Sequence, residues 1–128
     1  MSKEMDNLEF EDHFKKRGFA SQRRYPNEPM LQFLSEHYFP LSCSARKKTH
    51  ILEVGCGSGA NLWAIAREGF NAYGLDIAKS ALPLCKKMLQ NYGTSAKLRV
   101  GNIRILPYNN DFFDAVVDVL SIEHTTLE

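Results

Sequence analysis

The chain has 128 residues, of which 44% are hydrophobic and 24% are charged, and its formal net charge at pH 7 is +1. This length predicts one domain with a sizeable core, while the balanced charge excludes a disordered polyelectrolyte and makes nucleic-acid binding unlikely. No apolar run approaches the roughly 18 residues that a membrane span needs, and the first residues lack the apolar segment of a signal peptide. Cys43, Cys56 and Cys85 are too few and too scattered for a disulfide framework or a zinc site. We therefore expect a cytoplasmic protein with no bound metal.

The N-terminal part of the sequence is polar and predicts helices. Residues 1–27 mix charged with apolar side chains, a pattern compatible with a short helix packed on a larger body. Asn27 can cap a second helix that carries Pro29 in its first turn, and Pro40 ends that helix. Residues 41–49 are rich in serine, lysine and arginine, so we expect a solvated connector there.

Beyond this connector the pattern changes to alternating strands and helices. Short apolar runs predict four strands, at residues 50–54, 71–76, 96–101 and 112–120. Apolar stripes at helical spacing predict a helix after each of the first two strands, the first ended by Gly69 and the second capped by Ser80. This order implies right-handed crossovers and a parallel sheet, and we expect its valine-rich fourth strand to be covered on both faces.

A glycine-rich turn follows the first strand, at the place where a parallel sheet opens its ligand crevice. The turn spans residues 53–61, and its glycines permit a tight bend and a close approach of a ligand to the backbone. Asp76 ends the next strand, where a carboxylate can accept hydrogen bonds from ribose hydroxyls. The spacing of Gly55, Gly57 and Ala60 also satisfies the dinucleotide-binding fingerprint. A glycine turn that holds no ligand is the remaining alternative.

Glu53, at the end of the first strand, distinguishes two classes of nucleotide ligand. A dinucleotide would bring a pyrophosphate to the turn, and a neighbouring carboxylate repels that anion. S-adenosylmethionine instead brings a cationic sulfonium and an ammonium group, which a glutamate attracts directly or through water. The alternative is a carboxylate that only caps the amides of the turn. Electrostatics therefore favours the sulfonium cofactor.

Several linked stretches of the sequence resemble the class I S-adenosylmethionine-dependent methyltransferases, over about residues 48–124. The stretches keep the order and the intervals of that family. They are Ile51–Gly59 as the first motif, Tyr73–Ile77 as the second, Gly101–Tyr108 as the adenine-contacting loop and Phe113–Val117 as the following strand.

This resemblance implies an α/β fold of three layers, a Rossmann-like parallel sheet of strand order 3-2-1-4 with helices on both faces. It also implies S-adenosyl-L-methionine as the cofactor, with residues 1–45 as a helical lid or cap and residues 46–128 as the cofactor-binding domain. The cofactor-binding residues that it implies are Glu53, Gly55, Cys56, Gly57, Asn61, Asp76, Ile77, Asn102, Ile103, Asp118 and Val119.

The resemblance also assigns roles to some of these residues. Glu53 would lie near the methionyl ammonium, Asp76 would bind the ribose hydroxyls, and Ile77 would lie against the adenine. Relatives more often carry aspartate at the position of Asn102, whose amide oxygen can still accept from the adenine amino group without charge assistance. Asp118 would approach the methionyl group, or it is an ordinary polar strand end.

The residues that carry out the methyl transfer cannot be assigned from the sequence. Holding the acceptor in line with the methyl group supplies much of the catalysis, and a general base helps when the acceptor is a hydroxyl. His124 lies in a region from which relatives approach the acceptor, but a histidine packed at a helix start explains it as well. Arg24 and Tyr25 belong either to a lid over the cofactor or to the surface.

The chain ends where relatives continue with further strands, so we expect a truncated methyltransferase fold. A fourth strand at the sheet edge invites pairing with another chain, and a homo-oligomer is one possible result. A natural short module completed by a partner is another. The leading hypothesis is a methyltransferase that acts on an O, N or C nucleophile of a small molecule. The alternatives are a non-catalytic S-adenosylmethionine-binding or pairing module and a nicotinamide dinucleotide-binding protein.

Overall fold

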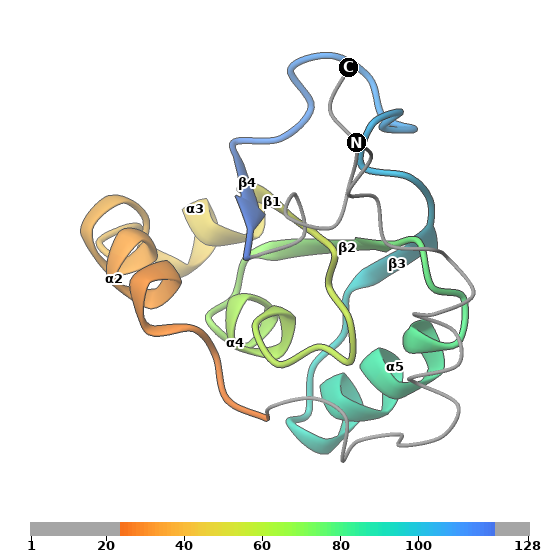
Figure 1. Cartoon of the computed structure of the whole chain (residues 1–128). Helices are drawn as coiled ribbons and strands as arrows, with labels where there is room; N and C mark the ends of the chain where they lie inside the picture. Colours follow the sequence, from red (N-terminus) through yellow and green to blue (C-terminus); the bar gives the residue numbers. More distant parts are fainter. Residues whose placement is uncertain (1–23, 120–128) are drawn as a thin grey trace.

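The computed structural model describes residues 24–119, which form a four-stranded parallel sheet packed against helices (Figure 1). The strands are β1 (His50–Val54), β2 (Asn71–Asp76), β3 (Lys97–Val100) and β4 (Ala115–Asp118). Their order in the sheet is β3-β2-β1-β4, and each neighbouring pair is parallel. The parallel sheet and its strand order are thus confirmed, although β3 and β4 are shorter than the sequence pattern predicts.

Four helices lie among the described residues, and two of their predicted ends are confirmed. They are α2 (Glu28–His37), α3 (Cys43–Lys47), α4 (Leu62–Arg67) and α5 (Ala81–Asn91). Asn27 caps α2, because its Oδ1 accepts the amide hydrogen of Met30 at 3.0 Å. Gly69 follows α4 with a φ of 97°, the left-handed conformation that commonly ends a helix. None of the helices within residues 24–119 has the length and apolarity that a bilayer crossing requires.

Two other predictions about the helices are wrong. Ser80 stands at the N-cap position of α5 but has helical dihedral angles and makes no capping hydrogen bond with its side chain. Part of the expected connector is helical, since Ser42 caps α3 by accepting the amide hydrogen of Ala45 at 3.2 Å. A short polar helix of this kind has no apolar stripe from which it could have been recognised.

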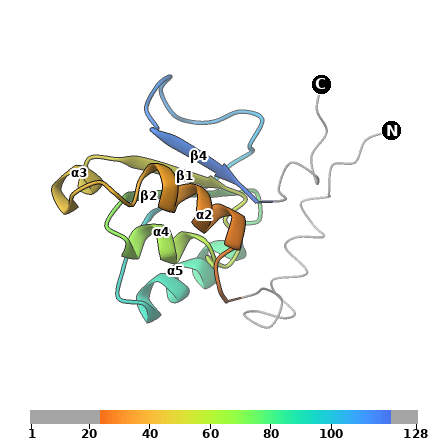
Figure 2. The same cartoon turned by 90° about the vertical axis from the view of Figure 1, so that its left-hand side faces the viewer.

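The helices α2, α4 and α5 lie over one face of the sheet (Figure 2). Alternate strand residues Ile51, Ala72 and Val117 belong to the core on this face. Met30 and Leu34 of α2 enter the same core, which we call the helix-side core. The helical segment before residue 46 thus shares its hydrophobic packing with the sheet, and the predicted boundary between a lid and a cofactor domain stays a prediction.

The opposite face of the sheet is covered by the loop that joins β3 to β4 rather than by helices (Figure 2). We call Tyr73, Tyr108, Phe112 and Phe113 the aromatic cluster, in which Phe113 makes edge contacts with the other three rings at centroid distances of 4.8–5.1 Å. Burial among these rings raises the pKa of Tyr108 above its ordinary value. Within residues 24–119 the expected second layer of helices is therefore not found.

The predicted two-sided burial of β4 is wrong for one of its valines. Val117 is buried on the helix side, but Val116 is 53% exposed on the other face. Because β4 is an edge strand, the aromatic cluster over β1 and β2 does not reach far enough to cover it. Among residues 24–119, β4 is thus an edge strand of the sheet, as the sequence predicts.

Arg46 joins the segment before β1 to the end of α4, contrary to its expected place in a solvated connector. Its Nη1 donates to Glu68 Oε1 at 3.0 Å and to the Glu68 carbonyl at 2.7 Å. Its other nitrogens donate to the carbonyls of Leu41 and Phe39. The guanidinium also lies 5.3 Å from the centroid of the Phe70 ring. Several hydrogen bonds on one planar group fix the angle at which this segment enters the sheet.

We expect Arg46→Ala to lower the free energy of unfolding by roughly 1–3 kcal/mol, because it removes hydrogen bonds to a charged donor and leaves carbonyl groups unpaired. The neighbouring Lys47→Ala is the matched control, since Lys47 is exposed and its loss should change that free energy by less than about 0.5 kcal/mol. Urea denaturation followed by circular dichroism measures both values. Equal unfolding midpoints for the two variants would contradict this role of Arg46.

Gly74 lies next to Glu53 in the β1–β2 pairing and permits the close packing of α4 on the sheet. A Cβ at this position would lie 2.6 Å from Leu62 Cδ2 and 3.1 Å from Cys56 Sγ. We expect Gly74→Ala to cost roughly 1–3 kcal/mol of stability through this overpacking. Leu62→Ala relieves the crowding, so it should cost less in the Gly74→Ala background than in the wild type. A double-mutant cycle in urea that gives strictly additive losses would exclude this cause.

Candidate functional site

The turn between β1 and α4 lies at the carboxyl edge of the sheet and depends on its glycines. Gly55, Gly57 and Gly59 have φ values of 68°, 55° and 94°, which other residues adopt only with strain. The amide groups of Gly55 and Cys56 donate to the Leu75 carbonyl at 2.7 and 3.1 Å. The bend is therefore tight, as the glycine pattern predicts, and it brings the turn back onto the end of β2.

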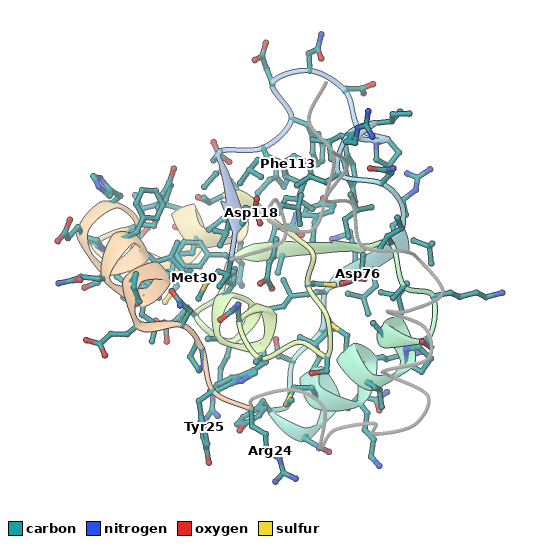
Figure 3. All side chains as sticks on the ribbon, in the orientation of Figure 1. Arg24, Tyr25, Met30, Asp76, Phe113 and Asp118 are labelled. Carbon is teal, nitrogen blue, oxygen red and sulfur yellow. The ribbon has the colours of Figure 1, made fainter. Side chains whose placement is uncertain are left out.

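Asp76 holds this turn against the end of β2. Its Oδ2 accepts the amide hydrogen of Gly57 at 2.7 Å, and its Oδ1 accepts that of Ala78 at 2.8 Å. The side chain is buried, and Figure 3 shows it beside the turn. Each carboxylate oxygen has a second lone pair, so the same group can also accept hydrogen bonds from ribose hydroxyls. Sequence reasoning missed the contact with Gly57, because it depends on how β1 and β2 are juxtaposed.

Glu53 ends β1 one residue before the turn and is 1% exposed. Its Oε2 accepts a hydrogen bond from Asn61 Nδ2 at 2.8 Å. Asn61 is buried too, and its Oδ1 accepts the amide hydrogen of Asn27 at 2.7 Å. Both polar ends of the Asn61 side chain are thus engaged with protein groups. The structure shows Asn61 as a hydrogen-bond partner of Glu53, while its predicted contact with the cofactor stays a prediction.

Cys56 contributes its side chain to the helix-side core. A hydrogen bond with the Cys85 thiol, burial, and the negative charges of Asp76 and Glu53 hold the pKa of Cys56 well above its ordinary value. This raised pKa favours the neutral thiol over the thiolate that a nucleophilic cysteine requires. The sequence separates the two cysteines widely, so only the packing of α5 against the turn brings them together. Two buried carboxylates, Glu53 and Asp76, thus lie at the two strand ends beside the turn.

Ser58 is a site residue that the sequence reasoning did not single out. It is 1% exposed, and its hydroxyl has no hydrogen-bond partner within the part of the chain that the structure describes. An unsatisfied buried hydroxyl is costly, and such groups are often completed by a ligand or by water. Together with the glycines of the turn, this hydroxyl fits a site that a polar ligand completes. Its place in the middle of the glycine turn was the signal that could have indicated it.

The three residues expected near the adenine differ in burial and in their contacts with the rest of the protein. Ile77 is half-buried and directly follows Asp76. Asn102 Oδ1 accepts the Arg104 amide hydrogen at 2.9 Å, so its oxygen already stabilises the local turn. Ile103 packs against the core on the loop-covered face of the sheet. The predicted contacts of these three residues with adenine stay predictions.

The carboxyl end of β4 lies next to the start of the glycine turn. Asp118 pairs with Val54 in the parallel ladder, and β1 lies between Asp118 on β4 and Asp76 on β2, the two residues labelled in Figure 3. Val119 packs against the helix-side core. The end of β4 thus lies beside the end of β1, as the predicted strand order requires. The roles of Asp118 and Val119 stay predictions. His124, the candidate base, lies outside the described residues.

Arg24 and Tyr25 lie apart from the glycine turn. Figure 3 shows both side chains projecting outward, away from Asp76 and Asp118. Tyr25 is 70% exposed, while the carbonyl of Arg24 accepts a hydrogen bond from Trp63 Nε1 at 3.0 Å. The two interpretations, a lid over the cofactor and surface residues, both stay predictions.

Comparison with known proteins gives the chain a family. A family model described as a methyltransferase domain matches residues 51–128. The chain is 32% identical to methyltransferase phqN of Penicillium fellutanum over 104 residues, which cover 77% of this chain and 32% of the relative. It is 28% identical over 78 residues to the ubiquinone biosynthesis O-methyltransferase of Coxiella burnetii (strain RSA 493), covering 61% of this chain and 33% of that protein. The chain thus spans about a third of the length of these curated relatives.

Solved structures share the fold. A SAM-dependent methyltransferase from Methanosarcina mazei is 26% identical, with a TM-score of 0.52, over 72% of this chain and 42% of that one. Magnesium protoporphyrin IX methyltransferase from Synechocystis PCC 6803 is 20% identical, with a TM-score of 0.59, over 90% of this chain and 59% of that one. Since the family model matches more than half of its residues, the chain belongs to the methyltransferase domain family, with the class I strand order.

Proposed function

We propose that the chain binds S-adenosylmethionine at the glycine turn. It is the cofactor-binding half of a methyltransferase that transfers a methyl group to an O, N or C nucleophile of a small molecule. The observation that carries this proposal is that three amide groups of the turn already donate hydrogen bonds to acceptors within the protein. Gly55 and Cys56 donate their amides to the Leu75 carbonyl, and Gly57 donates to Asp76. A pyrophosphate bound there would have to displace these bonds and approach two buried carboxylates, Asp76 and Glu53. A cationic ligand meets no such cost.

The residues of the turn fit the parts of this cofactor. Glu53 supplies the negative charge for the methionyl ammonium, and Asp76 supplies acceptors for the ribose hydroxyls. The Ser58 hydroxyl is a further polar group for the methionyl end. When bound, the cofactor supplies a methyl group on a good leaving group, so the protein needs mainly to hold the acceptor in line with it. Cys56 stays neutral and does not compete as an acceptor.

The names of the relatives support a small-molecule acceptor. Ubiquinone biosynthesis O-methyltransferases and a magnesium protoporphyrin IX methyltransferase are among the similar proteins, and their names refer to small molecules. The net charge of +1 also differs from the strong positive charge typical of nucleic-acid-binding domains. A role of His124 as general base and association of copies through the β4 edge remain part of this proposal.

Titration calorimetry tests the cofactor directly. We expect S-adenosylmethionine and S-adenosylhomocysteine to bind and NAD not to bind. Glu53→Gln should weaken S-adenosylmethionine binding by roughly tenfold, because a charge-assisted contact with the ammonium is worth about 1.5 kcal/mol or more. Glu36→Gln on the exposed side of α2 is the matched control and should leave the affinity unchanged. Tighter cofactor binding by Glu53→Gln, or binding of NAD alone, would refute the proposal.

Asp76→Ala should lower the affinity for S-adenosylhomocysteine by roughly tenfold or more, since it removes a charge-assisted ribose contact worth about 1.5–3 kcal/mol. It also leaves the amides of Gly57 and Ala78 without their acceptor, so thermal unfolding must be measured beside the calorimetry. Asp76→Glu retains the charge and should keep part of the affinity. Unchanged affinity in a folded Asp76→Ala variant would remove Asp76 from the site.

A further inference from the structure

We infer that Asn61 is a positioning residue that orients the Glu53 carboxylate toward the ammonium group of the cofactor. The inference rests on the proposed function and deepens it, because it names the group that sets the geometry of the methionyl end. Asn61 acts through Glu53 and need not touch the cofactor itself.

The orientation of the Asn61 amide follows from its two partners. The backbone N–H of Asn27 can only donate, so the atom that faces it at 2.7 Å must be the acceptor Oδ1. Nδ2 then faces Glu53 Oε2 at 2.8 Å, where it donates to a carboxylate oxygen. Reversing the amide would place a donor against a donor and an acceptor against an acceptor. The side chain therefore has one favourable orientation.

Asn61 gives up its usual local role to make these contacts. It occupies the N-cap position of α4, where asparagine normally accepts an amide hydrogen from the first turn of its own helix. Here its φ and ψ are −90° and −38°, and its side chain makes no capping hydrogen bond. Its hydrogen-bonding capacity is directed to Glu53 and Asn27 instead. The amides of Trp63 and Ala64, which an N-cap side chain would serve, donate to the carbonyls of Gly59 and Asn61 at 3.1 and 3.2 Å, so α4 does not need the Asn61 side chain as a cap.

A neutral donor suits the proposed role of Glu53 better than a cation would. Asn61 fixes one oxygen of the buried carboxylate while leaving the full negative charge on the group. A lysine or arginine in the same place would neutralise that charge and repel the ammonium. Asn61 is itself held from the other side, since Asn27 also caps α2 through Met30. Through Asn61, the Glu53 carboxylate is thus anchored to the backbone at the N-terminus of α2.

Two ligands that differ only at the methionyl end separate positioning from simple support of the fold. S-adenosylhomocysteine carries the ammonium group, whereas 5′-methylthioadenosine retains the adenosine and the thioether but lacks it. We expect Asn61→Ala in the full chain to weaken S-adenosylhomocysteine binding about tenfold and 5′-methylthioadenosine binding less than about twofold. In the Glu53→Gln background, the same substitution should change S-adenosylhomocysteine binding less than about twofold. Asn109→Ala, at an exposed asparagine, is the control and should change neither affinity.

The outcomes distinguish this inference from the proposed function. Equal losses for both ligands, an unchanged S-adenosylhomocysteine affinity, or a full effect in the Glu53→Gln background would overturn the role of Asn61. A wild-type chain that binds neither ligand would instead overturn the proposed function. Retained 5′-methylthioadenosine binding shows that a variant is folded. If Asn61→Ala does not fold, Asn61→Ser is measured against the same two ligands with the same criteria.

Discussion

The carboxylate of Asp76 connects the backbone segments from which the site is built. One of its oxygens binds the turn after β1, and the other binds the segment after β2. Together with the hydrogen bonds from Gly55 and Cys56 to the Leu75 carbonyl, this bridge restrains a turn with three positive-φ glycines, residues that lose more conformational freedom on folding than any other. The acceptor that fixes the turn is also the group that we propose binds the ribose. Under that proposal, the stability of the turn and the recognition of the nucleoside depend on one side chain.

Close packing beneath the turn maintains this arrangement. Gly74 on β2 leaves room for Leu62, so α4 approaches the sheet closely enough for Asn61 to reach Glu53. On the next helix, Cys85 lies 3.0 Å from the position that a Cβ on Gly59 would take. Helices α4 and α5 therefore press against the turn from the same face. The negative charge of the site is held by a rigid, mostly apolar support.

The sequence predicts those features that depend on neighbouring residues or on shared motifs. The Asn27 cap, the glycine conformations and the parallel strand order are of this kind. Features that depend on contacts between distant segments were missed or were predicted wrongly. Arg46 is an example, because a basic residue in a polar segment does not indicate that its side chain binds backbone carbonyls. The Cys56–Cys85 contact and the diversion of Asn61 from capping have the same cause. The exposure of Val116 follows from its edge position, which a valine run alone does not reveal.

The loop over the second face of the sheet links two ends of the site. Ile103, beside the residue expected to face the adenine, packs in the same core as Phe112 and Phe113, which lead directly into β4. The amide of Asp114 then donates to the His50 carbonyl at 2.8 Å, which fastens this loop to the beginning of β1. The loop that carries Asn102 and Ile103 is thus joined by continuous packing to the strand that carries Asp118.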